Sequence, residues 1–320
     1  MTILVTGGAG YIGSHMVHEL VDAGEPVVVL DNLSTGFRIL IPKSVPFVPG
    51  STGDRDLVAK TLRDHDVTAI IHFAASIVVP DSVRDPLGYY RNNTMNTSAL
   101  LEMAIEANIK KFIFSSTAAV YGNPEQVPVR EDAPTVPISP YGSSKLMSEI
   151  MLHDAGRAHD LRFVILRYFN VAGADPKLRT GQSTPAATHL IKVACEAALG
   201  KRPKMNVFGT DYPTPDGTCI RDYVHVSDLA RAHSAALAYL RRGGKSATFN
   251  CGYGKGASVL EVIDAVRRAS GRDFPVEIAG RRAGDPPALV ANVDRIRATL
   301  DWRPRFQDLD TIVSRLDPNC

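Results

Sequence analysis

The stretch that decides the fold is TGGAGYIG, residues 6–13. A short apolar run at residues 2–5 precedes it and predicts a β-strand, and the apolar periodicity of residues 11–21 predicts a helix. Glycine is needed where a strand turns tightly into a helix and where bare backbone approaches a pyrophosphate at the helix N-terminus. The pattern therefore predicts a dinucleotide-binding turn. A glycine-rich turn in an unrelated α/β protein is the weaker interpretation, because a strand and a helix flank the motif.

A carboxylate follows at the position where such a turn needs one. The second apolar run, residues 26–30, ends in Asp31, eighteen residues after Gly13. A carboxylate at this strand end bonds the adenosine ribose hydroxyls and repels a 2′-phosphate. We therefore expect NAD rather than NADP, with Arg38 as the nearby cation able to soften that preference.

Composition describes a globular protein of one large or two modest domains. The chain has 320 residues, with 44% hydrophobic and 22% charged residues and a net charge of +2, so charge gives no case for nucleic acid or an anionic membrane. No apolar run approaches the ~18 residues of a membrane helix. The first strand follows Met1 at once, which leaves no room for a signal peptide. We therefore expect a cytoplasmic protein.

No metal site is expected. The cysteines lack a CxxC spacing and are typical of reduced thiols rather than of disulfides or a zinc site: Cys195, Cys219, Cys251 and Cys320. His15 and His18 share a predicted helix without a third ligand. His72, on an apolar strand, is expected to be a core residue.

Strands alternate with helices through the first half of the chain, which predicts an α/β fold with a doubly wound parallel sheet and a smaller C-terminal α/β lobe. Further strands are expected at residues 45–48, 69–73, 111–115 and 162–167, and helices at 54–64, 85–108 and 140–158. Residues 223–240 and 248–251 are expected to return to the main sheet as a helix and a strand. We expect an NAD-binding Rossmann domain at 1–173 plus 223–251, and a substrate-binding lobe at 174–222 plus 252–320.

The chemistry is predicted from a Tyr and a Lys four residues apart. Tyr141 and Lys145 lie on one face of the helix at 140–158. A lysine ammonium, together with a nicotinamide cation, favours the phenolate of a group with an unperturbed pKa of ~10. That suits a general base. Thr117 follows the strand at 111–115, where its hydroxyl can bond the substrate oxygen and relay its proton, whereas Ser115 and Ser116 fit an ordinary polar strand end.

At this point the chain resembles the extended short-chain dehydrogenase/reductases, and within them the UDP-glucose 4-epimerase (UDP-galactose 4-epimerase) family, over nearly its whole length. The motifs are TGGAGYIGSH at 6–15, DNLS at 31–34, HFAA at 72–75, SSTAAVYG at 115–122, YGSSK at 141–145, RYFN at 167–170, FGTDYPTPDGTCIRDYVHV at 208–226 and AGDPPAL at 283–289. The long run at 208–226 is the most distinctive of them.

The resemblance implies NAD-dependent interconversion of UDP-glucose and UDP-galactose through a 4-keto-hexose, in a homodimer formed through the helices at 85–108 and 140–158. It makes Tyr141 the catalytic base, Lys145 its partner and nicotinamide-ribose anchor, and Thr117 the hydroxyl relay. The implied cofactor residues, besides Tyr141 and Lys145, are Gly7, Gly10, Tyr11, Ile12, Asp31, Asn32, Phe73, Ala74, Ala75, Asn92 and Asn93. The implied substrate residues are Asn170, His189, Leu190, Phe208, Arg221, Arg282, Asp285 and Leu289, the last beside the sugar C2 substituent.

Departures and alternatives remain open. The family often has Gly-Asp after the third strand where this chain has Gly50-Ser51, and many members have a lysine where Ile77 stands. The C-terminal helix looks curtailed at residues 317–320. Alternatives are an epimerase of UDP-N-acetylglucosamine or UDP-glucuronate and a non-catalytic NAD-binding protein. A 4,6-dehydratase would need an Asp-Glu pair where Ala118 and Ala119 stand.

Overall fold

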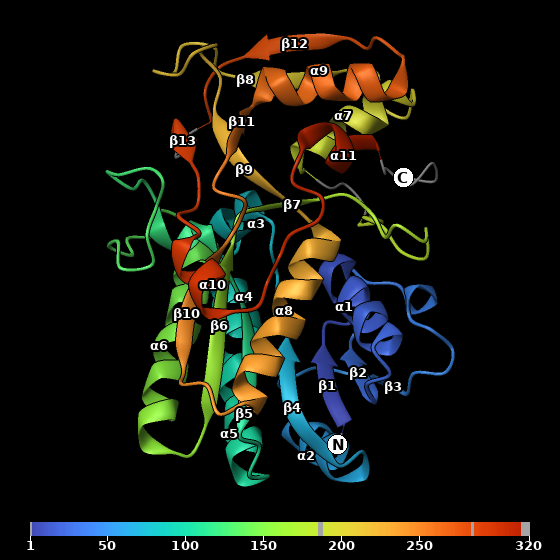
Figure 1. The fold of residues 1–320 in the computed structure, drawn as a ribbon, viewed down its shortest axis with the longest axis vertical. Coiled ribbons are helices and arrows are strands. Elements are labelled where there is room, and N and C mark those ends of the chain that lie inside the picture. Colours follow the sequence, from blue (N-terminus) through green and yellow to red (C-terminus); the bar gives the residue numbers. More distant parts are fainter. Residues whose placement is uncertain (1, 185–187, 283–284, 315–320) are drawn as a thin grey trace.

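A seven-stranded parallel sheet forms the centre of the computed structural model, which describes residues 2–184, 188–282 and 285–314 (Figure 1). Its strands lie in the order β10-β6-β5-β4-β1-β2-β3. They are β1 (Thr2–Thr6), β2 (Val27–Asp31), β3 (Phe47–Pro49), β4 (Val67–His72), β5 (Lys111–Thr117), β6 (Arg162–Tyr168) and β10 (Ala247–Cys251). The strand order reverses between β1 and β4, and ligands bind at that switch point in doubly wound sheets. The predicted fold class is confirmed.

Both faces of this sheet are buried, which explains why its strands are apolar throughout rather than alternating. Ile3 and Val5 of β1 belong to one apolar cluster, whereas Leu4 between them belongs to the other. Successive side chains of a strand point to opposite faces, so a sheet covered on both sides needs apolar residues at every position.

Helices cover the two faces. One face packs against α1 (Tyr11–Asp22) and α8 (Val226–Arg241), and the other against α2 (Arg55–Asp64), α5 (Asn96–Glu106) and α6 (Pro140–Ala158). Shorter elements complete this part of the chain: the 3-10 helices η1 (Arg38–Leu40) and η3 (Ala118–Tyr121), α3 (Val79–Arg84), α4 (Pro86–Tyr89) and the π-helix η2 (Tyr90–Met95). The helix expected at 85–108 is therefore a run of α4, η2 and α5 that ends at Glu106.

A smaller lobe stands over the carboxyl ends of the main strands, at the top of Figure 1. Its central strand β9 (Ile220–His225) pairs in parallel with β7 (Asn170–Ala172) and β13 (Ala288–Leu289) and antiparallel with β11 (Gly256–Ser258). A second pair joins β8 (Met205–Phe208) to β12 (Val276–Ala279). The remaining helices are α7 (Leu190–Ala198), α9 (Val259–Ser270), α10 (Asp294–Thr299) and α11 (Leu309–Ser314).

One predicted element is wrong at its start. The helix expected from residue 223 begins at Val226, and Tyr223 to His225 belong to β9. Their backbones pair with Asn170 to Ala172 of β7, a long-range contact that the local apolar pattern does not reveal. The curtailed terminus at 317–320 lies outside the described residues.

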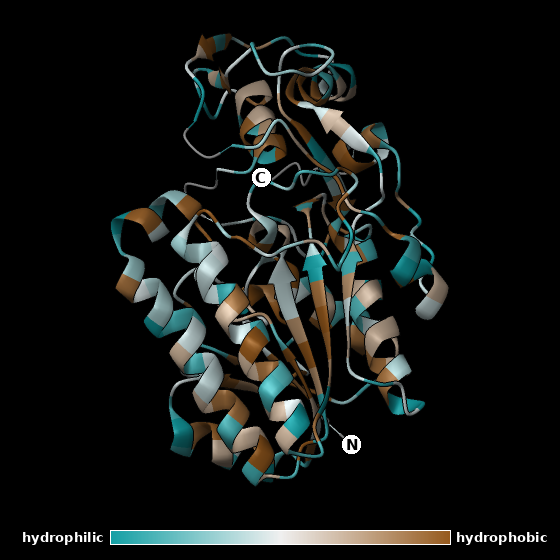
Figure 2. Ribbon diagram, turned by 90° about the vertical axis from the view of Figure 1, so that its left-hand side faces the viewer, coloured by the Kyte–Doolittle hydropathy of each residue, from teal (hydrophilic) through white to brown (hydrophobic). Residues whose placement is uncertain are grey.

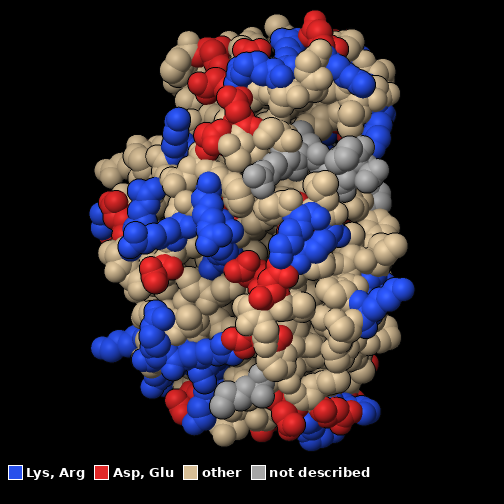
Figure 3. Space-filling model, turned by 45° about the vertical axis from the view of Figure 1, so that its right-hand side comes forward, with Lys and Arg blue, Asp and Glu red and all other residues tan. Residues whose placement is uncertain are grey.

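The surface carries both signs of charge. Basic and acidic side chains are interspersed on the face seen in Figure 3, and many surface charges are paired, as Arg241 is with Glu25. None of the helices in the described ranges is long and apolar enough to cross a membrane.

Candidate active site

The three predicted catalytic side chains lie where the carboxyl end of β5 meets the N-terminal end of α6. Ser139 caps α6, with Pro140 in its first turn, so that Tyr141 and Lys145 fall on consecutive turns of one buried face. Tyr141 is 8%, Lys145 3% and Thr117 8% exposed. The Thr117 side chain lies close enough to the Tyr141 phenol to affect its pKa, and the Lys145 ammonium lies 4.6 Å from the centre of the Phe114 ring.

The acidity of the Tyr141 phenol differs from the expectation. Burial raises its pKa to about 12, and the hydrogen bond with Thr117 opposes this rise without overcoming it. Burial also lowers the pKa of Lys145 to about 7, against a smaller opposing effect of Glu149. In the chain without cofactor desolvation therefore dominates, and the lowered phenol pKa expected beside Lys145 and a nicotinamide cation stays a prediction for the NAD complex.

A buried ion pair lies one turn beyond Lys145. Glu149, 1% exposed, accepts from Nη2 of Arg167, 6% exposed, at 2.6 Å and from its Nε at 3.0 and 3.1 Å. Ser116 donates to the same carboxylate at 2.5 Å, and Arg167 Nη1 donates to the Tyr121 hydroxyl at 2.9 Å. The pair joins α6 to β6 and so fixes the helix that carries Tyr141 and Lys145.

The glycine turn has the shape of a pyrophosphate cradle. Gly7 has φ +69°, and a Cβ there would lie 2.6 Å from the backbone nitrogen of Ala74. A Cβ on Gly13 would lie 2.1 Å from the carbonyl oxygen of Gly7. Gly10 is the N-cap of α1 and supplies no capping side chain, and a helix N-terminus of this kind is suited to an anion. These residues fit NAD.

The ribose carboxylate is already oriented. Asp31 accepts from the backbone of Ala9 at 2.9 Å and of Leu33 at 2.7 Å, which ties the glycine turn to the end of β2. Asn32, beside it, is exposed and accepts from the backbone of Ser34 at 3.0 Å. Arg38 donates to the Ile41 carbonyl at 3.0 Å and lies over the Phe47 ring, so in this structure its guanidinium is already engaged.

Two asparagines hold the loop after β4. Asn93 accepts from the backbone nitrogen of Ser76 at 2.7 Å and donates to its carbonyl at 2.9 Å and to Ser144 of α6 at 3.0 Å. Asn92 donates to the Ser76 hydroxyl at 2.9 Å. Both come from the π-helix η2, and such turns often occur at functional sites. The loop includes the half-buried Phe73, Ala74 and Ala75.

Ser51 and Ile77, the two departures from the family pattern, are described by their contacts and exposure. Ser51 accepts from the backbone of Gly53 at 3.2 Å, and Asn96 Nδ2 lies 3.5 Å from the same hydroxyl. Ile77 is 46% exposed. His72 bonds Thr6 at 2.6 Å and Thr97 at 2.9 Å, and burial lowers its pKa to about 3, which confirms it as a core residue.

Five predicted substrate residues gather around β9 and β8. Arg221 Nη2 lies 3.5 Å from the Asp285 carboxylate, and Nη1 donates to the Pro286 carbonyl at 2.9 Å. Leu289 of β13 stands opposite Arg221 in the strand register. The guanidinium of Arg282 lies 3.8 Å from the centre of the Phe208 ring. Two guanidinium groups of this set can recognise a diphosphate.

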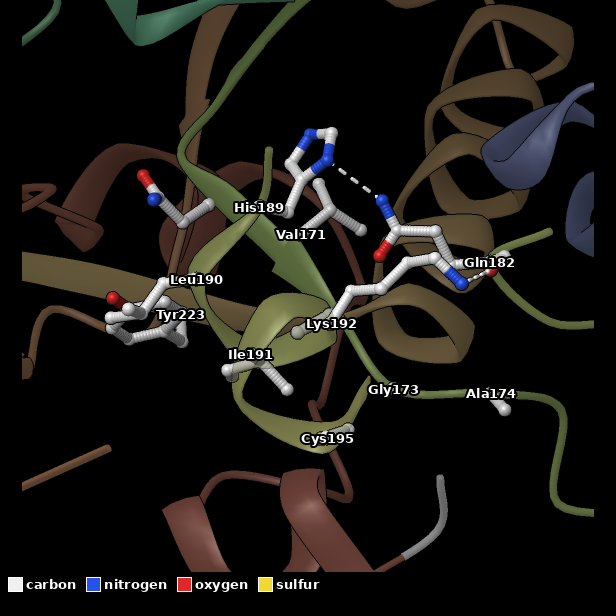
Figure 4. A pocket seen from close by; sticks show the side chains of 12 residues that line it. Val171, Gly173, Ala174, Gln182, His189, Leu190, Ile191, Lys192, Cys195 and Tyr223 are labelled. Atoms are coloured by element: carbon white, nitrogen blue, oxygen red, sulfur yellow. Dashed lines mark hydrogen bonds between the residues drawn. The ribbon is translucent and has the colours of Figure 1, made fainter. Parts of the chain in front are cut away.

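The other three line a pocket between β7, β9 and α7, seen in Figure 4. Asn170, His189 and Leu190 share it with nine further residues: Val171, Ala172, Gly173, Ala174, Gln182, Ile191, Lys192, Cys195 and Tyr223. Gln182 and Lys192 belong to no motif identified in the sequence. The Tyr11 hydroxyl donates to the Gly173 carbonyl, so this lining contacts the glycine turn directly.

Comparison with known proteins agrees with the geometry. The NAD dependent epimerase/dehydratase family matches residues 3–252. The chain is 64% identical to a UDP-glucose 4-epimerase of Azospirillum brasilense over 97% of this chain and 89% of that protein. A UDP-glucose 4-epimerase from Brucella ovis, solved in complex with NAD, has a TM-score of 0.97 and 44% identity over 99% of this chain and 98% of that one. The UDP-Glc/GlcNAc 4-epimerase of Campylobacter jejuni has a TM-score of 0.87 and 49% identity, again over 99% and 98%.

Proposed function

The chain belongs to the NAD dependent epimerase/dehydratase family, and from that premise we propose that it interconverts UDP-glucose and UDP-galactose, with NAD as its cofactor. The observation that carries the proposal is the buried group of Tyr141, Thr117 and Lys145, between the glycine turn and the lobe that carries Arg221. Relatives named UDP-glucose 4-epimerase span nearly the whole chain.

The cofactor is held by the glycine turn, by Asp31 and by the loop after β4. Its pyrophosphate meets the glycine turn and the N-terminus of α1, and its adenosine ribose meets Asp31. When bound, NAD supplies a hydride acceptor that is restored within each catalytic cycle. We propose residues 1–173 and 223–251 as the cofactor half, because α8 and β10 pack in the main sheet unit, and 174–222 and 252–320 as the substrate half. The pairing of β7 with the end of β9 forms the junction between the two halves.

Tyr141 removes the proton of the sugar C4 hydroxyl and later returns it. The Thr117 hydroxyl, beside the phenol, orients the substrate oxygen and relays the proton. Lys145 in its charged form favours the phenolate, which is costly in this buried site without positive charge. General base catalysis of this kind typically contributes ~10²–10⁴-fold.

Binding through the UDP moiety leaves the sugar free to turn. Arg221 and Arg282 pair with the diphosphate. Asp285 orients Arg221, and the guanidinium of Arg282 lies over the ring of Phe208. Asn170, His189 and Leu190 line the other wall. A 4-keto sugar anchored in this way can present either face to the cofactor, which epimerisation at C4 requires.

The test is direct. Purified protein is incubated separately with UDP-galactose, UDP-N-acetylgalactosamine and UDP-glucuronate, and the products are identified by chromatography. We expect UDP-glucose as the main product from UDP-galactose. A 4-keto-6-deoxy product would show elimination instead, and an absence of turnover by protein that retains NAD would refute the proposal in favour of a non-catalytic role.

We also propose a homodimer and a cytoplasmic location. Met95, Met147 and Ile150 are 64%, 44% and 52% exposed on η2 and α6. The helix α6 lies on the left of Figure 1, the side that faces the viewer in Figure 2. Burying such residues against a second copy gives an isologous contact. Cys219 and Cys251 are buried free thiols, which is typical of a reducing compartment.

A further inference from the structure

The pocket of Figure 4 contains a chain of polar contacts that ends on His189. Gln182, 7% exposed, places its side-chain nitrogen 2.7 Å from Nδ1 of His189. Lys192, also 7% exposed, donates from Nζ to the main-chain carbonyl of Gln182 at 2.6 Å. The same Nζ lies 3.4 Å from Oε1 of Glu196. Three buried or half-buried side chains are thus arranged behind one imidazole.

This contact fixes the state of the ring. An amide nitrogen donates hydrogen bonds and does not accept them, so Nδ1 of His189 is the acceptor. In a neutral imidazole the other nitrogen then carries the proton. His189 consequently presents Nε2–H as a donor, while Nδ1 is held by Gln182.

We propose that Gln182 is a positioning residue which fixes this tautomer of His189, so that Nε2–H donates to an oxygen of the UDP moiety. The inference rests on the proposed function, which brings UDP to this wall of the pocket. Lys192 contributes by holding the main chain of Gln182 in place. Phosphate oxygens and ribose hydroxyls are the acceptors that such a donor recognises.

Burial and a neighbouring positive charge both favour the neutral form of the His189 ring. Desolvation and, second, the positive charge of Lys192 lower the pKa of His189. Lys192 is itself paired with Glu196, which also binds Arg202. The other titratable residues of the pocket are Tyr223, whose pKa is raised by burial, and Cys195. Glu196, the one carboxylate among these groups, is not among the causes of the pKa shift of His189.

The experiment measures UDP affinity of the NAD-bound protein by calorimetry between pH 6.5 and 8.5. Gln182→Leu removes the donor, and we expect about 3–10-fold weaker binding, the range of one lost hydrogen bond. Gln182→Glu substitutes an acceptor, which moves the proton to Nδ1 and raises the pKa of His189. The ratio of its dissociation constant to that of wild type should then fall as pH falls, because the imidazolium pairs with the diphosphate.

The controls isolate His189. Both effects should vanish in a His189→Gln background, and Gln307→Glu, an exposed change of the same chemistry, should leave the ratio flat with pH. A flat ratio for Gln182→Glu, or a pH dependence that persists without His189, overturns the inference. Circular dichroism and NAD content check that each variant is folded.

Wild-type turnover separates this inference from the function. If wild type epimerises UDP-galactose and the Gln182 variants behave as wild type, only the positioning role fails. If wild type binds UDP with the expected pH behaviour of its variants but does not epimerise, only the proposed function fails. Wild type that binds no UDP overturns both.

Discussion

Replacing Lys145 by Met should stabilise the cofactor-free protein, and the gain should depend on pH. Burial lowers the pKa of Lys145 from 10.5 to about 7, and each pH unit corresponds to about 1.4 kcal/mol. The charged lysine therefore costs the fold on the order of 4 kcal/mol near and below pH 7. Because the unfolded chain binds the proton up to pH 10.5 and the folded chain does not above about 7, the stability of wild type rises with pH through this window.

Urea denaturation followed by circular dichroism between pH 7 and 10 measures the effect on protein stripped of NAD. We expect the difference between Lys145→Met and wild type to be largest at pH 7 and to shrink steadily toward pH 10. Lys43→Met, at an exposed lysine, should give a small difference that does not vary with pH. A Lys145→Met protein that is less stable at pH 7, or a difference constant with pH, would refute the reasoning. The same variant should lose turnover, since stability and function oppose each other at this position.

Four further outcomes are expected. Tyr141→Phe should retain NAD and lose ~10²–10⁴-fold in kcat; near-wild-type turnover would remove Tyr141 from the role of base. Mass spectrometry of the extracted cofactor should find mainly NAD, since Asp31 repels a 2′-phosphate and Arg38 is engaged with the Ile41 carbonyl; mainly NADP would contradict this. Light scattering at micromolar concentration should show a dimer for wild type and a monomer for Ile150→Glu, and a monomeric wild type would exclude the proposed assembly. Leu289→Tyr should lower, and Leu289→Ser raise, the kcat/KM for N-acetylated relative to plain UDP-hexoses, by ~1–3 kcal/mol of discrimination; if neither variant changes that ratio, the pocket is bounded elsewhere.

The local sequence pattern predicts the main sheet and its helices, because each strand and helix carries its own signal in consecutive residues. Strands buried on both faces are continuous apolar runs, and the helix at Pro140–Ala158 begins at its serine cap and proline. The glycine turn and Asp31 were placed by spacing alone, and the structure brings them together through the Ala9 and Leu33 amides. For the remaining site residues the resemblance, rather than spacing, supplied the expectation.

The features that the sequence did not reveal depend on contacts that form only in the folded chain. Tyr223 reads as part of an apolar helix, yet pairing with Asn170 makes it a strand. Gln182 and Lys192 lie ten residues apart outside any motif, and only the fold places them behind His189. The raised pKa of Tyr141 in the chain without cofactor comes from desolvation, which depends on how completely the neighbours cover the phenol and is not visible in a spacing of four residues.

The ion pair of Glu149 and Arg167 has a consequence for the inheritance of this chain. Loss of either partner alone leaves an uncompensated buried charge and costs about 3–5 kcal/mol. That is a large share of the ~5–15 kcal/mol by which a domain is usually stable. A substitution at one of the two positions therefore gives a poorly folded protein unless the other position also changes. The two positions should co-vary among related sequences although 18 residues separate them.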